Sequence, residues 1–437
     1  MRALLIGGGG REHAIALSIV KSGTELVVLS HNRNPGLLRI ARKVVIGDQN
    51  DRVWVLENAL RMKPDYVFIG PESPLAAGIT DTLLEKGLKV FAPSSTAARL
   101  ETSKSFCREF MRENGIGGNV DSTPFSDPEK AEEFVRGIDY DFVIKPDGLT
   151  GGKGVVVQGV HFRTKEEGGK IIREYLASGA GKILVERRLI GEEFSLQAFA
   201  LGRRIYFLPV VQDYKRAREN DEGPNTGGMG SICFSERGLP FISKETLDMA
   251  KGIMKKLVDK LVENGINYVG PIYGGFMSTS DGPKLLEINA RLGDPEAINV
   301  LSLMENSIVD VASGMYNEQD VHIEFRDRVN VLRYIVPVGY GESPIPSTIS
   351  IEEEKLLLRG LRIFYASVNK RGKVLKQTPS RSIALLSEGM ELGEAVARFN
   401  GIAPLIRGKY FMREDIGTES AIQRKKKFMD EVAAGRA

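Results

Sequence analysis

Residues 143–157 have the sequence VIKPDGLTGGKGVVV, which combines a short apolar run with two lysines and a glycine-rich turn. Lys145 ends the apolar run, and Lys153 stands inside the turn. Glycines let backbone amides approach phosphate oxygens, and lysines supply point charge, so the pattern is typical of a nucleotide-phosphate site. The GxxxxGK[ST] spacing of a P-loop is missing, and a surface hairpin is the alternative interpretation of this segment alone.

A second polar pattern follows in residues 285–296, LLEINARLGDPE, where Glu287, Asn289 and Arg291 alternate with other residues. Successive side chains of a strand point to opposite faces, so these three would share one face. Carboxylate and amide oxygens suit magnesium, and an arginine can contact a terminal phosphate through two hydrogen bonds. An exposed strand face is the alternative, but both segments together predict an ATP-using enzyme.

The N-terminal hundred residues alternate short apolar runs with helical patterns, which favours a doubly wound parallel sheet. A GGGG turn at 7–10 precedes the first helix and could receive a phosphate there. A nicotinamide-cofactor site is excluded, because Glu12 replaces the third glycine of that motif and the second strand ends in SHN (30–32) without a ribose-binding acid. Two interpretations of the turn at 7–10 remain: a phosphate-binding site or a tight turn without a ligand.

The rest of the chain is expected to mix longer strands with helices. Residues 120–190 would form a mobile lid around the glycine turn, hinged near 117–118 and 190–191. The polar, glycine-rich loop at 212–230 is typical of functional loops, with a disordered insertion as the alternative. Helices are expected at 51–62, 75–86, 103–114, 244–264 and 391–400, and strands at 194–201, 204–211, 273–278 and 284–288.

Composition is that of a globular chain of two to four domains, since 42% of its 437 residues are hydrophobic and 27% are charged. The formal net charge of +3 does not suggest nucleic-acid binding, and the basic run RKKK at 424–427 is expected to be a solvated helix end. Cys107 and Cys233 lack disulfide or zinc spacing, and no apolar run is long enough to cross a membrane. We therefore expect a cytoplasmic protein.

Eight motifs occur in order along the chain: GGGGREHA (7–14), GPESPLAAGI (70–79), ETSKSF (101–106), VIKPDGLTGGKGVVV (143–157), VERRLIGEEFS (185–195), QDYKR (212–216), GPNTGGMG (223–230) and EINARLGDPE (287–296). Together they resemble the phosphoribosylamine–glycine ligase (glycinamide ribonucleotide synthetase) family of the ATP-grasp superfamily. The joint order is specific, although each motif alone is weak. Tyr214 stands where family members usually have histidine, and Gly275 where some relatives have a polar residue.

The resemblance implies an α/β ATP-grasp fold with an N-terminal doubly wound parallel-sheet domain (1–103), an ATP-grasp domain (104–328) that includes the 120–190 lid, and a β-rich C-terminal domain (329–437). It implies ATP-dependent ligation of glycine to 5-phosphoribosylamine through glycyl phosphate, in de novo purine biosynthesis. The expected ligands are ATP, Mg²⁺ or Mn²⁺ and these two substrates, with no nucleic acid or membrane partner, in a monomer or weak homodimer. Another ATP-grasp carboxylate–amine ligase, a biotin-dependent carboxylase and a non-catalytic nucleotide sensor remain alternatives.

The resemblance also implies roles for individual residues. Arg291, Lys145 and Lys153 would be catalytic, and Glu287 and Asn289 would bind the metal. ATP would contact Lys104, Lys145, Lys153, Gly151, Gly152, Gly154, Glu186, Leu189 and Glu193. Glycine, the acyl intermediate and phosphoribosylamine would contact Gly9, Gly10, Asp213, Lys215, Arg216, Asn225, Thr226, Gly227, Gly228, Met229, Asp294, Pro295 and Glu296.

Overall fold

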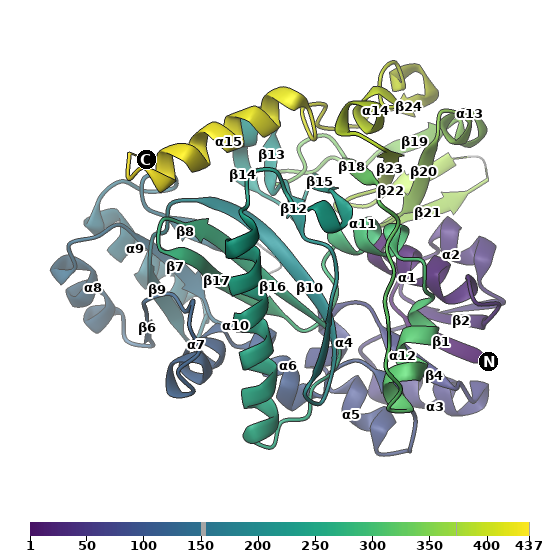
Figure 1. The fold of residues 1–437 in the computed structure, drawn as a ribbon, viewed down its shortest axis with the longest axis horizontal. Coiled ribbons are helices and arrows are strands. Elements are labelled where there is room, and N and C mark those ends of the chain that lie inside the picture. Colours follow the sequence, from purple (N-terminus) through teal and green to yellow (C-terminus); the bar gives the residue numbers. More distant parts are fainter. Residues whose placement is uncertain (150–153, 373, 437) are drawn as a thin grey trace.

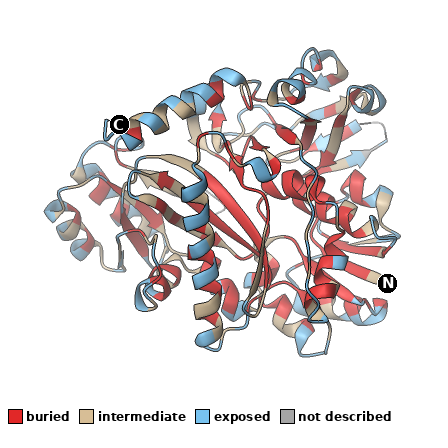
Figure 2. Ribbon diagram, viewed as in Figure 1, coloured by how far each residue is buried: buried red, intermediate tan, exposed pale blue. Residues whose placement is uncertain are grey.

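The computed structural model describes residues 1–149, 154–372 and 374–436, so Gly151, Gly152 and Lys153 of the predicted phosphate loop lie outside the described residues. Figure 2 shows that the buried residues concentrate in the central strands and that the outer faces of the helices are exposed. Among the described helices, none combines the length and apolar character that crossing a bilayer requires.

A parallel sheet opens the chain and confirms the predicted doubly wound arrangement (Figure 1). Its strand order is β3-β2-β1-β4-β5, and each neighbouring pair is parallel. Leu5 packs in one core while Leu4 and Ile6 pack in another, because successive strand residues face opposite sides of the sheet. The strands are β1 (Arg2–Ile6), β2 (Glu25–Ser30), β3 (Lys43–Ile46), β4 (Tyr66–Ile69) and β5 (Val90–Phe91).

Helices cover both faces of this sheet. The single helix predicted at 75–86 is wrong: Gly78 adopts the left-handed conformation, with φ of 75°, and separates α4 from α5. The helices of this part are α1 (Gly10–Val20), α2 (Pro35–Ile40), α3 (Arg52–Met62), α4 (Glu72–Ala76), α5 (Ile79–Leu84), α6 (Ser95–Thr102) and α7 (Lys104–Glu113).

The segment predicted as a lid forms a separate antiparallel sheet with the order β6-β9-β7-β8. Two helices pack on it, and Phe142, Ile144 and Ile172 belong to a small core of its own. In Figure 1 this unit lies at the edge of the molecule farthest from β1. Its elements are β6 (Ser122–Phe125), α8 (Pro128–Gly137), β7 (Phe142–Pro146), β8 (Val156–Val157), α9 (Lys165–Ala177) and β9 (Ile183–Arg187).

The largest sheet runs through the middle of the molecule, in the order β17-β16-β10-β12-β15-β18-β23-β20, with β11 paired to β10. The predicted pairing of 273–278 with 284–288 is confirmed, and it places Tyr273 opposite Asn289 and Gly275 opposite Glu287. The strand predicted at 204–211 is interrupted around Pro209, which has no N–H to donate to a ladder.

The sheet also passes the expected domain boundary at residue 329, because β18 pairs with β15. The elements from β10 to β18 are β10 (Glu192–Leu201), β11 (Arg204–Phe207), β12 (Val211–Asp213), β13 (Arg216–Arg218), β14 (Glu222–Asn225), β15 (Gly230–Cys233), α10 (Lys244–Glu263), β16 (Val269–Thr279), β17 (Gly282–Asn289), α11 (Glu296–Leu303), α12 (Ile308–Tyr316) and β18 (Val329–Ile335).

The C-terminal part adds a small antiparallel sheet, β21-β22-β19-β24, and a final helix that contains the basic run expected at a helix end. That helix, α15, runs along the outside of the molecule above β13 and β14 (Figure 1). The remaining elements are β19 (Thr348–Ile351), α13 (Glu353–Leu358), β20 (Leu361–Tyr365), β21 (Val368–Arg371), β22 (Val374–Gln377), β23 (Ile383–Gly389), α14 (Leu392–Ala397), β24 (Ile406–Gly408) and α15 (Glu419–Ala433).

A pair of glycine substitutions tests the contact between the first sheet and the central one. Gly270 has φ of 99°, and a Cβ there would lie 2.9 Å from backbone atoms of Phe91 and Ala92. We expect Gly270→Ala to destabilise the protein by more than about 2 kcal/mol, because neither strand can yield without losing its pairing. Thermal melting measures this as a lower Tm.

The matched control is Gly252→Ala in α10, where a Cβ meets no atom within 4 Å. This change is expected to leave Tm unchanged or to stabilise the helix by up to about 1 kcal/mol. Equal Tm values for both variants would contradict the proposed close approach of the two sheets.

Candidate functional site

A cavity of about 330 Å³ lies where β17, β16 and β12 face α7, the lid sheet and the N-terminal part. It brings together predicted residues from segments far apart in the sequence. Those that line it are Lys104, Lys145, Glu193, Asp213, Lys215, Asn225, Thr226, Gly227, Glu287, Asn289, Arg291, Asp294 and Glu296. Other predicted and described residues do not line it: Gly9, Gly10, Gly154, Glu186, Leu189, Arg216, Gly228, Met229 and Pro295.

The predicted metal ligands lie together at the end of β17. Asn289 donates a hydrogen bond from Nδ2 to Oε1 of Glu287, at 3.3 Å. Burial raises the pKa of Glu287, but Lys215, Lys145 and Arg291 outweigh burial, so the net pKa is lowered and the carboxylate is ionised at neutral pH. One carboxylate and one amide oxygen fit a hard cation such as Mg²⁺, which takes its remaining ligands from phosphates and water.

The strand predicted to carry Arg291 is too long, because β17 ends at Asn289 and Arg291 lies in the bend that follows. Two carboxylates of the N-terminal part hold Arg291 there. Its guanidinium lies 3.2 Å from Glu101 and 3.4 Å from Glu72. Glu101 also accepts a hydrogen bond from the Ala290 amide at 2.7 Å. Burial raises the pKa of Glu72, but Arg291 and Arg11 lower it to about 2 overall. The orientation of the Arg291 guanidinium is therefore set by two carboxylates of the N-terminal part.

Two predicted lysines lie on the lid side of the cavity. Lys104 donates to the carbonyls of Pro146 at 3.0 Å and Gly148 at 2.6 Å, and burial lowers its pKa. Lys145 pairs with Glu186 at 2.6 Å. The Glu186 side chain is thus engaged in a buried ion pair, which leaves only its backbone for the adenine contact that the resemblance implies.

The opposite side of the cavity carries acidic residues close to one another. Burial raises the pKa of Asp213 well above its usual range, and Glu296 raises it further, although Lys215 opposes the shift. Burial also raises the pKa of Glu296. Lys215 forms an ion pair with Glu193 at 2.6 Å, so the predicted ribose contact and the predicted substrate lysine are direct neighbours.

Asp294 is fixed by two residues of the C-terminal part. Tyr334 donates from its hydroxyl to Asp294 Oδ1 at 2.7 Å, and Arg381 pairs with the same oxygen at 3.2 Å. The Arg381 guanidinium also donates to the carbonyls of Gly227 and Asp294. Arg381 therefore connects the 212–230 loop to the turn that follows β17.

The glycine turn at 7–10 is occupied by a side chain of its own helix. Glu12 accepts a hydrogen bond from the Gly9 amide at 2.5 Å, which caps α1 with a carboxylate. Gly10 packs closely, since a Cβ there would lie 2.4 Å from the Tyr334 hydroxyl. A Cβ on Gly9 would lie 3.9 Å from Asp294 Oδ2, so the turn borders the cavity.

Several cavity residues were missed as candidates by the sequence interpretation. Glu72 and Glu101 lie inside the motifs GPESP and ETSKSF, so a signal existed for them. Tyr273 could have been found because it is paired with Asn289 across the predicted hairpin. Arg11 and Arg381 also line the cavity, and Arg381 lies in a segment without a motif.

Sequence comparison identifies the family. Residues 1–101 match the phosphoribosylglycinamide synthetase N domain, and residues 102–297 match the phosphoribosylglycinamide synthetase ATP-grasp (A) domain. The chain is 41% identical over 432 residues to a phosphoribosylamine–glycine ligase of Pyrococcus furiosus, covering 98% of this chain and 97% of the relative. The chain belongs to the phosphoribosylglycinamide synthetase family.

Further comparisons agree with this assignment. A phosphoribosylamine–glycine ligase of Thermococcus gammatolerans is 41% identical over 432 residues, covering 99% of this chain and 98% of the relative. The crystal structure of a phosphoribosylamine–glycine ligase from Thermotoga maritima matches with a TM-score of 0.80 and 30% identity, over 95% of this chain and all of that chain. The biotin carboxylase domain of a Hydrogenobacter thermophilus 2-oxoglutarate carboxylase shares the fold, with a TM-score of 0.72 and 16% identity, over 99% of this chain and 95% of that chain.

The buried acids predict a pH-dependent stability effect. Because folding raises the pKa of Asp213, this carboxyl costs stability above the unfolded-state pKa of about 4. The cost is full above the folded-state pKa, shrinks as pH falls below it, and is gone below the unfolded-state pKa. Asp213→Asn should therefore raise Tm by about 1–3 °C at pH 8, with the gain shrinking toward pH 4.

Thermal melting over this pH range measures the effect. Asp248→Asn, at an exposed position of α10, is the control and should change Tm little at any pH. A lower Tm for Asp213→Asn at pH 8 would contradict the assigned cost of the buried carboxylate.

Proposed function

We propose that the protein ligates glycine to 5-phosphoribosylamine with ATP, giving glycinamide ribonucleotide, ADP and phosphate through glycyl phosphate. Family membership supports the overall reaction. The observation that carries the site assignment is that Glu287 and Asn289 of β17, and Arg291 just beyond it, line one cavity with Lys104 and Lys145. A protein that only bound a nucleotide would not need such a set of terminal-phosphate contacts.

The first proposed step is phosphoryl transfer to glycine. A glycine carboxylate oxygen forms a bond to the γ-phosphorus of ATP, and the bond from that phosphorus to the ADP oxygen breaks. Such a step depends on positioning and on neutralising charge. Arg291, Lys145 and Lys104 would supply positive charge, and Lys153 would add to it. A bound Mg²⁺ or Mn²⁺, held by Glu287 and Asn289, would neutralise phosphate charge.

The second proposed step is attack by the amine nitrogen on the acyl carbon. A C–N bond forms, the C–O bond to phosphate breaks, and the amine loses one proton. Asp294 and Glu296, with Gly9, Gly10 and Pro295, would receive phosphoribosylamine. Good orientation of such partners can contribute about 7–11 kcal/mol to the barrier reduction.

The proposed roles of the remaining residues follow from their places. The glycine and acyl-phosphate side would be formed by Asp213, Lys215, Arg216 and 225–229. Glu193, Leu189 and the backbone of Glu186 would bind the nucleoside, and Gly151, Gly152 and Gly154 would bind the phosphates.

We also propose that residues 1–103, 104–328 and 329–437 form three units, with 120–190 as the mobile lid. The protein would be a cytoplasmic monomer or weak homodimer, with Cys107 and Cys233 as free thiols.

The reaction itself is tested by ADP release. We expect rapid ADP release only when glycine, phosphoribosylamine and Mg-ATP are all present, with one glycinamide ribonucleotide formed per ADP. Equal ADP release with bicarbonate in place of glycine would favour a carboxylase, and ATP binding without turnover would favour a nucleotide sensor.

Arg291→Lys tests the proposed terminal-phosphate contact. The lysine keeps the positive charge beside Glu101 and Glu72 but loses the planar fork of donors, so kcat/KM should fall about 100-fold or more. Steady-state kinetics measures the change. Arg203→Lys, whose side chain is 54% exposed, is the control. Activity of Arg291→Lys within about 3-fold of wild type would contradict the assignment.

A further inference from the structure

The 212–230 segment, which carries proposed substrate contacts, leaves the central sheet between β12 and β15 and forms the hairpin β13–β14. Its backbone closes on itself: Thr226 donates its amide to the Lys215 carbonyl at 2.8 Å, and Met229 donates to the Tyr214 carbonyl at 2.8 Å. Asp213 and Lys215 both line the cavity. The far side of this hairpin, which we call the substrate hairpin, contacts the C-terminal end of the chain.

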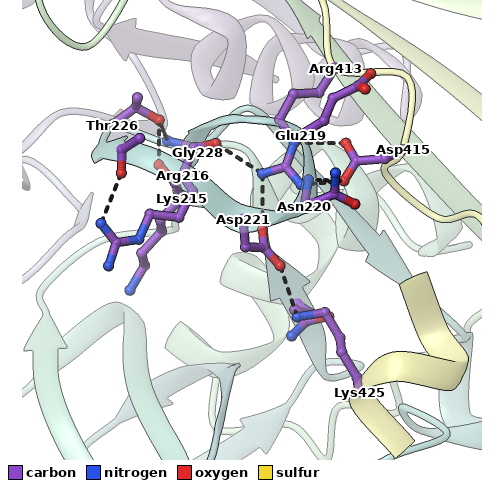
Figure 3. A network of polar contacts seen from close by, with 12 residues as sticks. Lys215, Arg216, Glu219, Asn220, Asp221, Thr226, Gly228, Arg413, Asp415 and Lys425 are labelled. Carbon is purple, nitrogen blue, oxygen red and sulfur yellow. Dashed lines mark hydrogen bonds and ion pairs between the residues drawn. The ribbon is translucent and has the colours of Figure 1, made fainter. Parts of the chain in front are cut away.

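Arg413 anchors the substrate hairpin from that side. One of its nitrogens donates to Asp221 Oδ1 at 2.9 Å and to the Arg216 carbonyl at 2.9 Å (Figure 3). The other two guanidinium donors form a fork onto Asp415, at 2.8 and 2.7 Å. The Arg413 side chain is 0% exposed. A planar guanidinium with every nitrogen engaged fixes the positions of its partners.

Lys425 of α15 forms the second anchor. Its ammonium lies 2.9 Å from Glu192 Oε2 and 3.4 Å from Asp221 Oδ2, and only 12% of its side chain is exposed. Glu192 lies on β10, directly before the proposed ribose contact Glu193. The expectation of a solvated helix end at 424–427 is therefore wrong for Lys425, because α15 turns that ammonium onto the carboxylates of Glu192 and Asp221.

Tyr214 packs beneath both anchors. The Arg413 guanidinium and the Lys425 ammonium each lie 5.2 Å from the centre of its ring, within the range of cation–π attraction. Tyr214 is buried, and its chain neighbours Asp213 and Lys215 line the cavity. Since successive side chains of an extended segment point to opposite sides, holding Tyr214 from behind directs its two neighbours into the cavity.

The substrate hairpin is also strained where the anchors hold it. Asn220 and Asp221 have φ of 58° and 56°, a left-handed conformation that costs every residue except glycine, although Asn and Asp tolerate it better than most. The Asn220 amide donates to Asp415 Oδ2 at 3.0 Å, and the Asp221 carboxylate accepts from Arg413 and Lys425. Such a conformation persists only when surrounding contacts determine it.

We propose that Arg413 and Lys425 are positioning residues for the ligation: they hold the substrate hairpin so that Asp213 and Lys215 face the bound glycine and its acyl phosphate. The inference rests on the proposed function, and it gives the C-terminal segment a part in substrate handling. Neither side chain lines the cavity, so both act through the substrate hairpin. The proposed phosphate contacts on the lid side, Lys104 and Lys145, have their own partners and do not contact either anchor.

The kinetic test compares Lys425→Met with Lys427→Met on the same helix. Lys427 is 81% exposed and lies 4.0 Å from Glu431, so the control removes an equal charge away from the substrate hairpin. Lys425→Met should raise KM for glycine about 10-fold and leave KM for ATP within about 2-fold, while Lys427→Met changes neither. Lys425→Arg, which keeps a donor and its charge, should restore most of the glycine affinity.

The structural test uses trypsin cleavage after Arg216 and Arg218, followed by mass spectrometry. Arg413→Lys keeps the charge but loses the fork, and it should increase cleavage at these two sites about 5-fold or more. Arg407→Gln is the control, because Arg407 is 75% exposed and pairs with Glu352 away from the substrate hairpin. If Arg413→Lys does not fold, Lys425→Met serves in the same assay.

These experiments distinguish a failure of the anchoring role of Arg413 and Lys425 from a failure of the proposed ligation. Wild-type cleavage rates in Arg413→Lys and Lys425→Met would overturn the anchor, and equal increases in KM for glycine and ATP would overturn its selectivity for the substrate side. Wild-type protein without glycine-dependent ADP release would overturn the proposed function and the substrate role that rests on it, whereas the cleavage assay would still report on the anchor.

Discussion

The site depends on a buried ion cluster in which Glu186 of the lid sheet pairs with Lys145 at 2.6 Å and with Arg108 of α7 at 2.8 Å. Arg108 also donates to the carbonyls of Leu285 and Leu286, immediately before Glu287. A buried carboxylate would be very costly alone, and burial raises its pKa, but the two cations lower that pKa to about 2. The lid is thereby joined to β17 directly beside the proposed metal ligands.

Charged side chains elsewhere in the cavity are also close to other charged groups. Arg291 is held between Glu72 and Glu101, while Glu296 lies close enough to Asp213 to raise the pKa of that carboxyl beyond what burial does. Burying several charged side chains together lowers the stability of the fold, and such clusters are typical of sites that bind charged substrates. Arg291, Lys145 and Lys215 are therefore each held in place by a carboxylate from another segment before any substrate binds.

The parallel sheet, the β16–β17 hairpin and the shared face of Glu287 and Asn289 could be predicted, because strand periodicity is local and appears in the sequence. The break at Gly78 and the interruption around Pro209 changed elements that periodicity alone extends. The contacts of Lys425 were missed, since a basic run on a helix has the same sequence whether water or carboxylates face it. Glu101 and Arg381 depended on contacts between distant segments, which no local pattern contains.

The central claim is that this cavity activates glycine by phosphorylating its carboxylate. Glycine labelled with ¹⁸O in both carboxylate oxygens tests it most directly, with mass analysis of the phosphate released during ligation. We expect one ¹⁸O in each phosphate and one in each glycinamide ribonucleotide, because the attacking oxygen leaves with phosphorus when the amine displaces it. Unlabelled phosphate, with ligation proceeding at its normal rate, would contradict the account.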